Sequence, residues 1–264
     1  MNIVVLVKQV PDTWADRTLS EADQTLNRDA VDAVINEIDE YAIEEGLRLK
    51  EAVNGGADNE VTILSMGPAR AADSIRKALS MGADKAIHVS DPALHGSCAM
   101  QTARVLAKAL GTTEWDLVVA GSESTDARLS IVPALLAEAL GVTQLTHARK
   151  VTVDGSTVTI ERQTDGGFDT VTGSTPAVIS VVEKINDPRY PSFKGIMAAK
   201  KKPVQTLTVA DLGLSADEVG LASASTEVRD FENAPPRQAG VVVKDEAGTG
   251  AGAIAEFLQS KKLI

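Results

Sequence analysis

Ile3-Val4-Val5-Leu6-Val7, near the start of the chain, is a short and uninterrupted apolar run that decides the fold class. Three similar runs follow it, at residues 61–64, 86–89 and 116–120. Short, continuous runs rich in β-branched residues are typical of strands in a parallel sheet that is covered on both faces. The four runs therefore predict the strands of such a sheet.

Helix-forming segments separate these runs. Residues 30–52, 69–80 and 97–110 carry apolar side chains at helical spacing, and Gly82 and Gly111 follow the last two, where a helix usually ends. The alternation of strand and helix predicts an α/β fold with a doubly wound, mainly parallel, Rossmann-like sheet and right-handed crossovers.

The second half of the chain changes pattern. Short segments at residues 149–153, 158–163, 168–172 and 177–182 are separated by turn signals such as Asp154-Gly155. An Asp-Gly pair between two strand-like runs is typical of a β-hairpin. The sheet is therefore expected to continue with additional antiparallel strands.

The last part of the chain is polar and without periodicity until a short helix predicted at residues 253–261. A segment of this composition forms an extended arm rather than a packed domain. We predict an α/β domain over residues 1–222 and an extended C-terminal arm with a short helix over residues 223–264.

Composition limits the classes of function. The chain has 264 residues, 44% of them hydrophobic and 3% aromatic, and its formal net charge of −11 argues against general binding to nucleic acid or anionic membranes. The one cysteine, Cys98, fits a reducing compartment. No basic segment precedes the first apolar run, and no run approaches the ~20 residues that span a bilayer. We expect a cytoplasmic protein without a signal peptide.

The predicted ligand site lies where the strand order of the sheet reverses. Ligands of open α/β sheets bind there, beyond the carboxyl ends of the strands. Residues 6–9, 36–39, 65–68 and 121–132 are expected to converge at this place. Small residues and backbone amides near helix N-termini suit the phosphate and ribose of a nucleotide. Neither a Gly-x-Gly-x-x-Gly pattern after the first strand nor a Walker A motif occurs in the sequence, which argues against fingerprint dinucleotide binding and P-loop chemistry.

Other reactive side chains point to no catalytic site. His88, His95 and His147 lack ligand spacing, so we expect no metal. Cys98 stands at a predicted helix start and suits a small core position. The hydroxyl residues after the fourth predicted strand have no histidine near them in sequence and are expected to cap the loop. We therefore predict no independent catalysis.

Residues 188–195 contain two prolines and a glycine, which predicts a stiff, irregular loop. This loop carries Tyr190 and Phe193 in a chain poor in aromatics, and aromatic anchors on a rigid loop are typical of protein-recognition sites. A loop folded onto its own core is the alternative. The run Lys200-Lys201-Lys202 that follows is either an exposed helix end or a contact for an acidic partner.

Residues 185–202, INDPRYPSFKGIMAAKKK, closely resemble the signature of electron transfer flavoprotein beta subunits, in which an Asn-x-Pro-Arg-Tyr sequence precedes a loop, Ile-Met and a lysine run. Residues 7–12, VKQVPD, resemble the exit of the family's first strand, and residues 165–167, DGG, its antiparallel part. Residues 121–126, GSESTD, are similar to actinobacterial members. The resemblance covers residues 1–215.

The resemblance implies an adenine-nucleotide-binding fold and a beta subunit that pairs with a larger alpha subunit, which holds most of the FAD. The heterodimer would accept electrons from acyl-CoA and related dehydrogenases and pass them to a membrane electron transfer flavoprotein–quinone oxidoreductase. The beta subunit would bury an AMP where the strand order reverses, and its C-terminal arm would pack on the alpha subunit.

The resemblance also assigns site residues by position. Trp14, Ile38 and Tyr41 would approach the flavin held by the alpha subunit. The recognition loop, residues 184–202, would dock dehydrogenases, with Phe193 as its anchor. The residues implied for AMP are Leu6, Asn36, Glu37, Ile38, Asp39, Met66, Gly121, Ser122, Glu123, Ser124, Thr125, Asp126, Ala127, Arg128, Ser130 and Val132. The residues implied for docking are Pro188, Arg189, Tyr190, Phe193, Ile196, Met197, Lys200, Lys201 and Lys202.

Residues 127–133, ARLSIVP, depart from the family pattern, in which small residues and glycine approach the AMP phosphate. Only Ser130 offers a hydroxyl here, and we expect Arg128 to replace lost amide contacts with a charge-assisted bond. Two alternatives stay open. One is an electron-bifurcating relative with a second FAD in this place, and the other is a free-standing protein that binds or hydrolyses adenine nucleotides.

Overall fold

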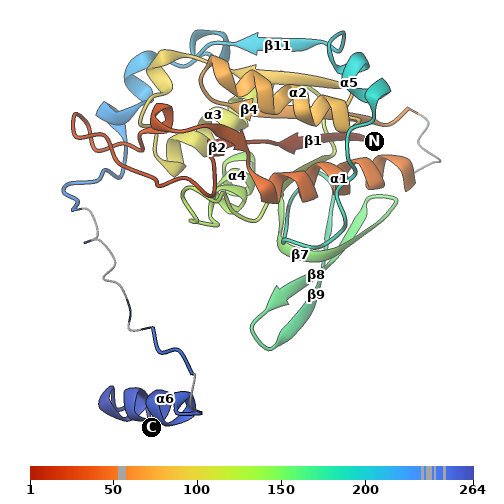
Figure 1. Ribbon diagram of the computed structural model, residues 1–264. Coiled ribbons are helices and arrows are strands. Elements are labelled where there is room, and N and C mark those ends of the chain that lie inside the picture. The colour runs from red at the N-terminus through yellow and green to blue at the C-terminus, as the bar shows by residue number, and fades with distance from the viewer. Residues whose placement is uncertain (53–57, 233–234, 236–239, 241, 246–247) are drawn as a thin grey trace. The chain divides into compact units, whose positions relative to one another are not determined.

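A computed structural model of the chain describes residues 1–52, 58–232, 235, 240, 242–245 and 248–264 (Figure 1). Its contacts divide the chain into two units, Met1–Arg229 and Asp230–Ile264. Among the described residues, the first unit contains the sheets and five α-helices, and the second contains α6 (Gly250–Ser260). None of the described helices is both long and apolar enough to cross a membrane.

Nine strands of the described chain form the main sheet, in the order β11-β5-β4-β1-β6-β10-β7-β8-β9. Every pairing from β11 to β7 is parallel, and β7-β8 and β8-β9 are antiparallel. The predicted mainly parallel sheet with added antiparallel strands is confirmed, but the segment at residues 177–182, expected to be antiparallel, contains β10 and pairs parallel with both of its neighbours. The strands are β1 (Asn2–Leu6), β4 (Glu60–Met66), β5 (Lys85–Val89), β6 (Leu117–Gly121), β7 (Thr143–Asp154), β8 (Thr157–Thr164), β9 (Gly167–Ser174), β10 (Ala177–Val181) and β11 (Val204–Leu207).

Helices cover both faces of the parallel part, as the continuous apolar runs require. Figure 1 shows α1 (Glu37–Ala52) and α2 (Ala72–Met81) on the near face, with α3 (Ala99–Leu110) and α4 (Val132–Leu140) behind. Successive side chains of a strand point to opposite faces. Ile3 and Val5 of β1 therefore join the core under α1 and α2, while Val4 and Leu6 join the core under α3 and α4.

The helix predicted over residues 30–52 begins later, at Glu37. Residues 28–30 form a short 3-10 helix, η1 (Arg28–Ala30), and β3 (Ala33–Ile35) pairs antiparallel with β2 (Gln9–Pro11). The extended pairing with β2 holds this segment out of the helix. Asn36 then lies directly before α1, with its backbone N–H bonded to the Lys8 carbonyl oxygen at 2.9 Å.

The strand order reverses between β1 and β6. From β1 the chain builds outward through β4 and β5, and then returns to place β6 and β10 on the other side. The segments that leave the carboxyl ends of β1 and β6 therefore separate there, and the N-terminus of α1 follows β1 into the same region. We call this place, formed by residues 6–9, 36–39 and 121–132, the switch-point crevice.

Candidate functional site

Hydrogen bonds join the three segments of the switch-point crevice. The Lys8 backbone N–H donates to Asp39 Oδ2 at 2.8 Å, which ties the exit of β1 to α1. The Asn36 side chain reaches the segment after β6, because its Nδ2 donates to the Glu123 carbonyl oxygen at 2.9 Å and its Oδ1 accepts from the Thr125 N–H at 3.0 Å. The expected convergence is therefore present for these three segments, whereas these hydrogen bonds do not reach residues 65–68, at the end of the neighbouring strand β4.

Asp39 is a buried carboxyl group within the switch-point crevice. It is 6% exposed, and its Oδ1 accepts a hydrogen bond from Asn36 Nδ2 at 2.8 Å. Burial raises the pKa of Asp39 to about 7, although the backbone amides of Lys8 and Gly121 and the Asn36 side chain favour the carboxylate. A Cβ on Gly121 would lie 2.5 Å from Asp39 Oδ1, so only glycine fits beside this carboxyl group.

Three cations surround the loop after β6. Lys8 Nζ donates to Ser124 Oγ at 3.1 Å and to Asp126 Oδ1 at 2.8 Å. Arg28 Nη2 lies 2.8 Å from Asp126 Oδ2, and Arg17 Nη1 donates to the Thr125 carbonyl oxygen at 2.5 Å. Burial opposes ionisation of Asp126, but the charges of Lys8 and Arg28 outweigh it and lower its pKa. Lys8 and Arg28 thus share one carboxylate, and Arg17 is bound to a backbone carbonyl oxygen of the same loop.

Some polar atoms of this loop and its neighbours are buried without a partner. Among the described residues, Thr125 Oγ1 and the Nε and Nη2 atoms of Arg17 have no hydrogen-bond partner. Buried donors and acceptors are nearly always satisfied in native proteins. Their presence beside the crevice fits a polar ligand bound there.

The remaining residues implied for AMP lie around this frame. Leu6, Met66 and Val132 belong to the apolar core on the side of α3 and α4. Ser122 is buried and its N–H donates to the Val181 carbonyl oxygen at 2.8 Å. Ile38 is buried in the first turn of α1. The other members lie at or near the surface, namely Glu37, Ala127, Arg128 and Ser130.

The glycine-free loop, residues 127–133, adopts glycine-like backbone angles at two positions. The φ angles of Arg128 and Ser130 are +50° and +54°, in the left-handed region that disfavours side chains. Both side chains turn toward Glu123, with Ser130 Oγ at 3.0 Å from Glu123 Oε2 and Arg128 Nη1 at 3.9 Å from Glu123 Oε1. Because non-glycine residues occupy these two left-handed positions, the loop carries local backbone strain.

Arg128→Gly should be about 0.5–1 kcal/mol more stable than Arg128→Ala. Both variants remove the same side chain, so the weak ion pair with Glu123 is lost in each, and only glycine relieves the positive φ. Urea denaturation of the two variants measures the difference. Equal midpoints and slopes would show that the left-handed angle carries no strain.

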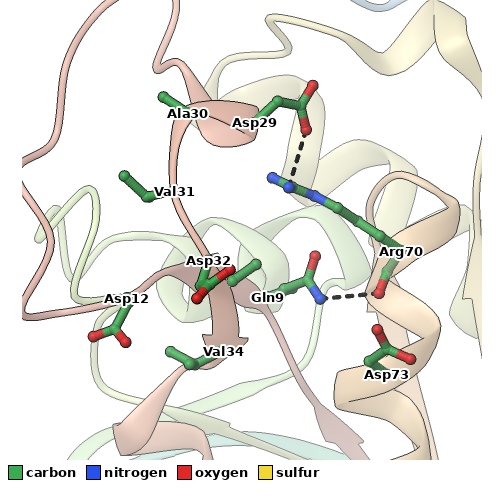
Figure 2. Close-up of a pocket in the computed structure, with 10 residues that line it drawn as sticks. Gln9, Asp12, Asp29, Ala30, Val31, Asp32, Val34, Arg70 and Asp73 are labelled. Atoms are coloured by element: carbon green, nitrogen blue, oxygen red, sulfur yellow. Dashed lines mark hydrogen bonds and ion pairs between the residues drawn. The ribbon is translucent and has the colours of Figure 1, made fainter.

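A hollow lies beside the exit of β1, where Gln9 lines it (Figure 2). It encloses about 920 Å³ and is lined by four aspartates, Asp12, Asp29, Asp32 and Asp73. Arg70 pairs with Asp29 at 3.0 Å. None of the residues implied for AMP lines this hollow, and its carboxylates would repel a phosphate. No local sequence pattern predicts this hollow, because its aspartates come from separate segments that only the fold brings together.

The three residues implied to approach flavin occupy different environments. Trp14 is 95% exposed on the loop after β2. Ile38 is buried in the first turn of α1, and Tyr41 packs against the core under α1 and α2. Of these three residues, only Trp14 exposes nearly its whole side chain.

The recognition loop, residues 184–202, displays its aromatic side chains. Tyr190 is 95% exposed and Phe193, the first residue of α5 (Phe193–Ala199), is 82% exposed. Ser192 caps this helix by accepting from the Gly195 N–H at 3.0 Å. Lys202, in contrast, donates from Nζ to the Leu79 carbonyl oxygen at 2.9 Å. The rings are thus available to a partner, whereas the Lys202 ammonium is bound within the chain.

Comparisons with known proteins point to one family. The family model described as electron transfer flavoprotein domain matches residues 23–212. The chain is similar to the electron transfer flavoprotein subunit beta of Mycobacterium tuberculosis (strain ATCC 25618 / H37Rv), with 54% identity over 265 residues that cover 100% of this chain and 99% of the relative. The protein of the same name from Thermoanaerobacterium thermosaccharolyticum is 36% identical over 265 residues, covering 100% of both chains.

Proposed function

The chain belongs to the electron transfer flavoprotein family as a beta subunit, and from this premise we propose how it takes part in electron transport. It pairs with an alpha subunit, and the heterodimer accepts electrons from acyl-CoA and related dehydrogenases. A membrane quinone oxidoreductase then takes the electrons from the heterodimer. FAD, held mainly by the alpha subunit, supplies the electron-carrying chemistry, and the beta chain has no independent catalysis.

We further propose that the switch-point crevice holds AMP. The observation that carries this proposal is the set of cations around the loop after β6, together with the buried, unpartnered atoms of Thr125 and Arg17 among the described residues. Lys8, Arg17 and Arg28 lie where an anionic group would gain most from charge-assisted hydrogen bonds. The side chain of Arg128 turns toward Glu123 at 3.9 Å, so a phosphate contact from Arg128 requires it to leave that carboxylate.

The nucleotide content of the purified heterodimer tests this proposal. We expect acid treatment to release one AMP and one FAD for each heterodimer of this chain with its alpha subunit, separable by chromatography. AMP below stoichiometric yield would contradict the proposed AMP site. Two FAD per heterodimer would favour the electron-bifurcating alternative, and nucleotide hydrolysis by the chain alone would favour the free-standing one.

The recognition loop is proposed as the surface that docks dehydrogenases. The exposed rings of Tyr190 and Phe193 support this role, because buried aromatic anchors dominate the affinity of many protein interfaces. Ile196 and Met197 are 45% and 48% exposed on the helix that Phe193 begins, and they extend the same apolar surface. An electron carrier needs contacts that form and dissociate quickly, so a small surface of this kind suits it.

The exposed apolar residues of α6 support a role for the C-terminal arm. Ile254 and Phe257 are 63% and 57% exposed in this helix. An exposed apolar helix face is costly in water unless a partner covers it. We propose that the alpha subunit is that partner.

A further inference from the structure

Arg189 stands four residues before the exposed ring of Phe193, but its guanidinium faces its own chain. Nε and Nη2 donate to Glu44 Oε2 and Oε1 at 2.7 and 3.0 Å. Nη1 and Nη2 donate to Glu51 Oε1 and Oε2 at 2.7 and 3.2 Å. Both glutamates belong to α1. One arginine therefore holds two carboxylates of the same helix, each through two hydrogen bonds.

Neighbouring contacts extend this attachment along α1. The backbone N–H of Arg189 also donates to Glu44 Oε2, at 3.1 Å. Asn186 Nδ2 donates to Glu45 Oε2 and to the Tyr41 carbonyl oxygen, both at 3.0 Å. The segment that enters the recognition loop is thus fixed to one side of α1 by side chains and backbone together.

The far end of the loop is fixed to α2. Arg76 Nη1 donates to the Ala199 carbonyl oxygen at 2.6 Å. A Cβ on Gly195 would lie 2.5 Å from the Ser80 carbonyl oxygen, so α5 approaches α2 closely. Figure 1 shows α5 beside the end of α2. Between these two attachments lie the exposed rings of Tyr190 and Phe193.

The pairing with Glu44 is stronger than an ordinary surface ion pair. Exposed pairs contribute little, because water screens them and the side chains lose freedom. The Glu44 side chain is 8% exposed, however, and its carboxylate would be a buried and unpaired charge without Arg189. The planar guanidinium matches two carboxylates at once, which a lysine ammonium does not.

We propose that Arg189 is a positioning residue, which acts through Glu44 and Glu51 to hold the recognition loop so that Tyr190 and Phe193 face a docking dehydrogenase. This inference rests on the proposed docking role of the loop. It differs from the expectation from sequence, in which Arg189 itself contacts the partner. Here the guanidinium is saturated by its own chain, and the rings make the contact.

Hydrogen exchange and kinetics of the purified heterodimer test the inference together. Arg189→Gln is expected to give roughly tenfold faster amide exchange over residues 193–199, because α5 loses its attachment to α1. The KM of an acyl-CoA dehydrogenase for the heterodimer should rise roughly fivefold with little change in kcat, because a mobile loop docks less often in the right geometry. The double variant Glu44→Gln/Glu51→Gln should show the same rise in exchange and in KM as Arg189→Gln. Arg104→Gln, which breaks the ion pair between Arg104 of α3 and Glu218, is the matched control and should change neither quantity.

Adding Arg189→Gln to the two glutamate substitutions separates positioning from direct contact. If Arg189 acts only through the glutamates, the triple variant has the same KM as the variants from which it is built. A further rise in KM, or a raised KM with unchanged exchange in Arg189→Gln, would overturn the inference. If Arg189→Gln does not fold, Arg189→Lys is the substitute, because it keeps the positive charge and should show exchange rates between those of the wild type and a fully detached loop. Wild-type exchange and KM in Arg189→Lys would also overturn the inference.

The docking role of the loop can fail separately. If Phe193→Ala leaves KM unchanged, the loop is not the docking surface. In that case the exchange rates of Arg189→Gln still decide whether Arg189 orders the loop. Fast exchange with unchanged KM in Arg189→Gln, together with a raised KM in Phe193→Ala, would overturn the link between loop order and docking alone.

Discussion

Replacing Phe193 with alanine is expected to lower kcat/KM for reduction of the heterodimer's flavin by an acyl-CoA dehydrogenase roughly thirtyfold, which corresponds to about 2 kcal/mol of binding free energy. Phe193 is 82% exposed at the first turn of α5, so its removal costs the folded chain little. Its ring can lose contact with water only against a partner. The FAD content and the flavin spectrum should stay unchanged, because α5 lies outside the switch-point crevice.

Phe168→Ala is the matched control for this prediction. Phe168 is 47% exposed on β9, with the Arg149 guanidinium 4.2 Å from its ring centroid, and it lies outside the recognition loop. The variant should reduce at the wild-type rate. The comparison needs partner concentrations below KM, because saturation hides a loss of affinity. Equal rates for Phe193→Ala and wild type under those conditions would remove the ring of Phe193 from the docking surface.

The parts of the fold that sequence predicts are those with a strong local signal. Buried parallel strands are continuous apolar runs. The four runs predicted as strands, of which residues 3–7 are the first, overlap β1, β4, β5 and β6. The start of α1 was predicted wrongly, because residues 33–35 form a strand through pairing with residues 9–11. A helical pattern in one segment carries no information about such a pairing.

The crevice could be predicted in outline, since the carboxyl ends of neighbouring strands must meet where the strand order reverses. Its charges could not. Arg17 and Arg28 lie in a long aperiodic segment, and their contacts with Thr125 and Asp126 span about a hundred residues of sequence. The same limit applies to Arg189, because its partners Glu44 and Glu51 appear in the sequence only as the polar side of a helix.

The stability of the wild type relative to Asp39→Asn is expected to fall by up to about 4 kcal/mol as pH rises from about 4 to about 7. Burial raises the pKa of Asp39 to about 7 in the folded chain. The unfolded chain has the ordinary aspartate pKa of about 4. Between these values the folded state binds a proton that the unfolded state does not, so Asp39 stabilises the fold most at low pH. This contribution is lost by about pH 7 and is constant above it.

Urea denaturation at several pH values between 4 and 8 measures this difference, and Asp39→Asn removes the titrating group at the cost of one hydrogen-bond acceptor. That cost does not depend on pH, so it shifts the curve without changing its slope. A difference that stays constant with pH would mean that Asp39 remains ionised in the fold. The amides of Lys8 and Gly121 and the Asn36 side chain would then outweigh burial, and the crevice would carry a fixed negative charge beneath any bound nucleotide.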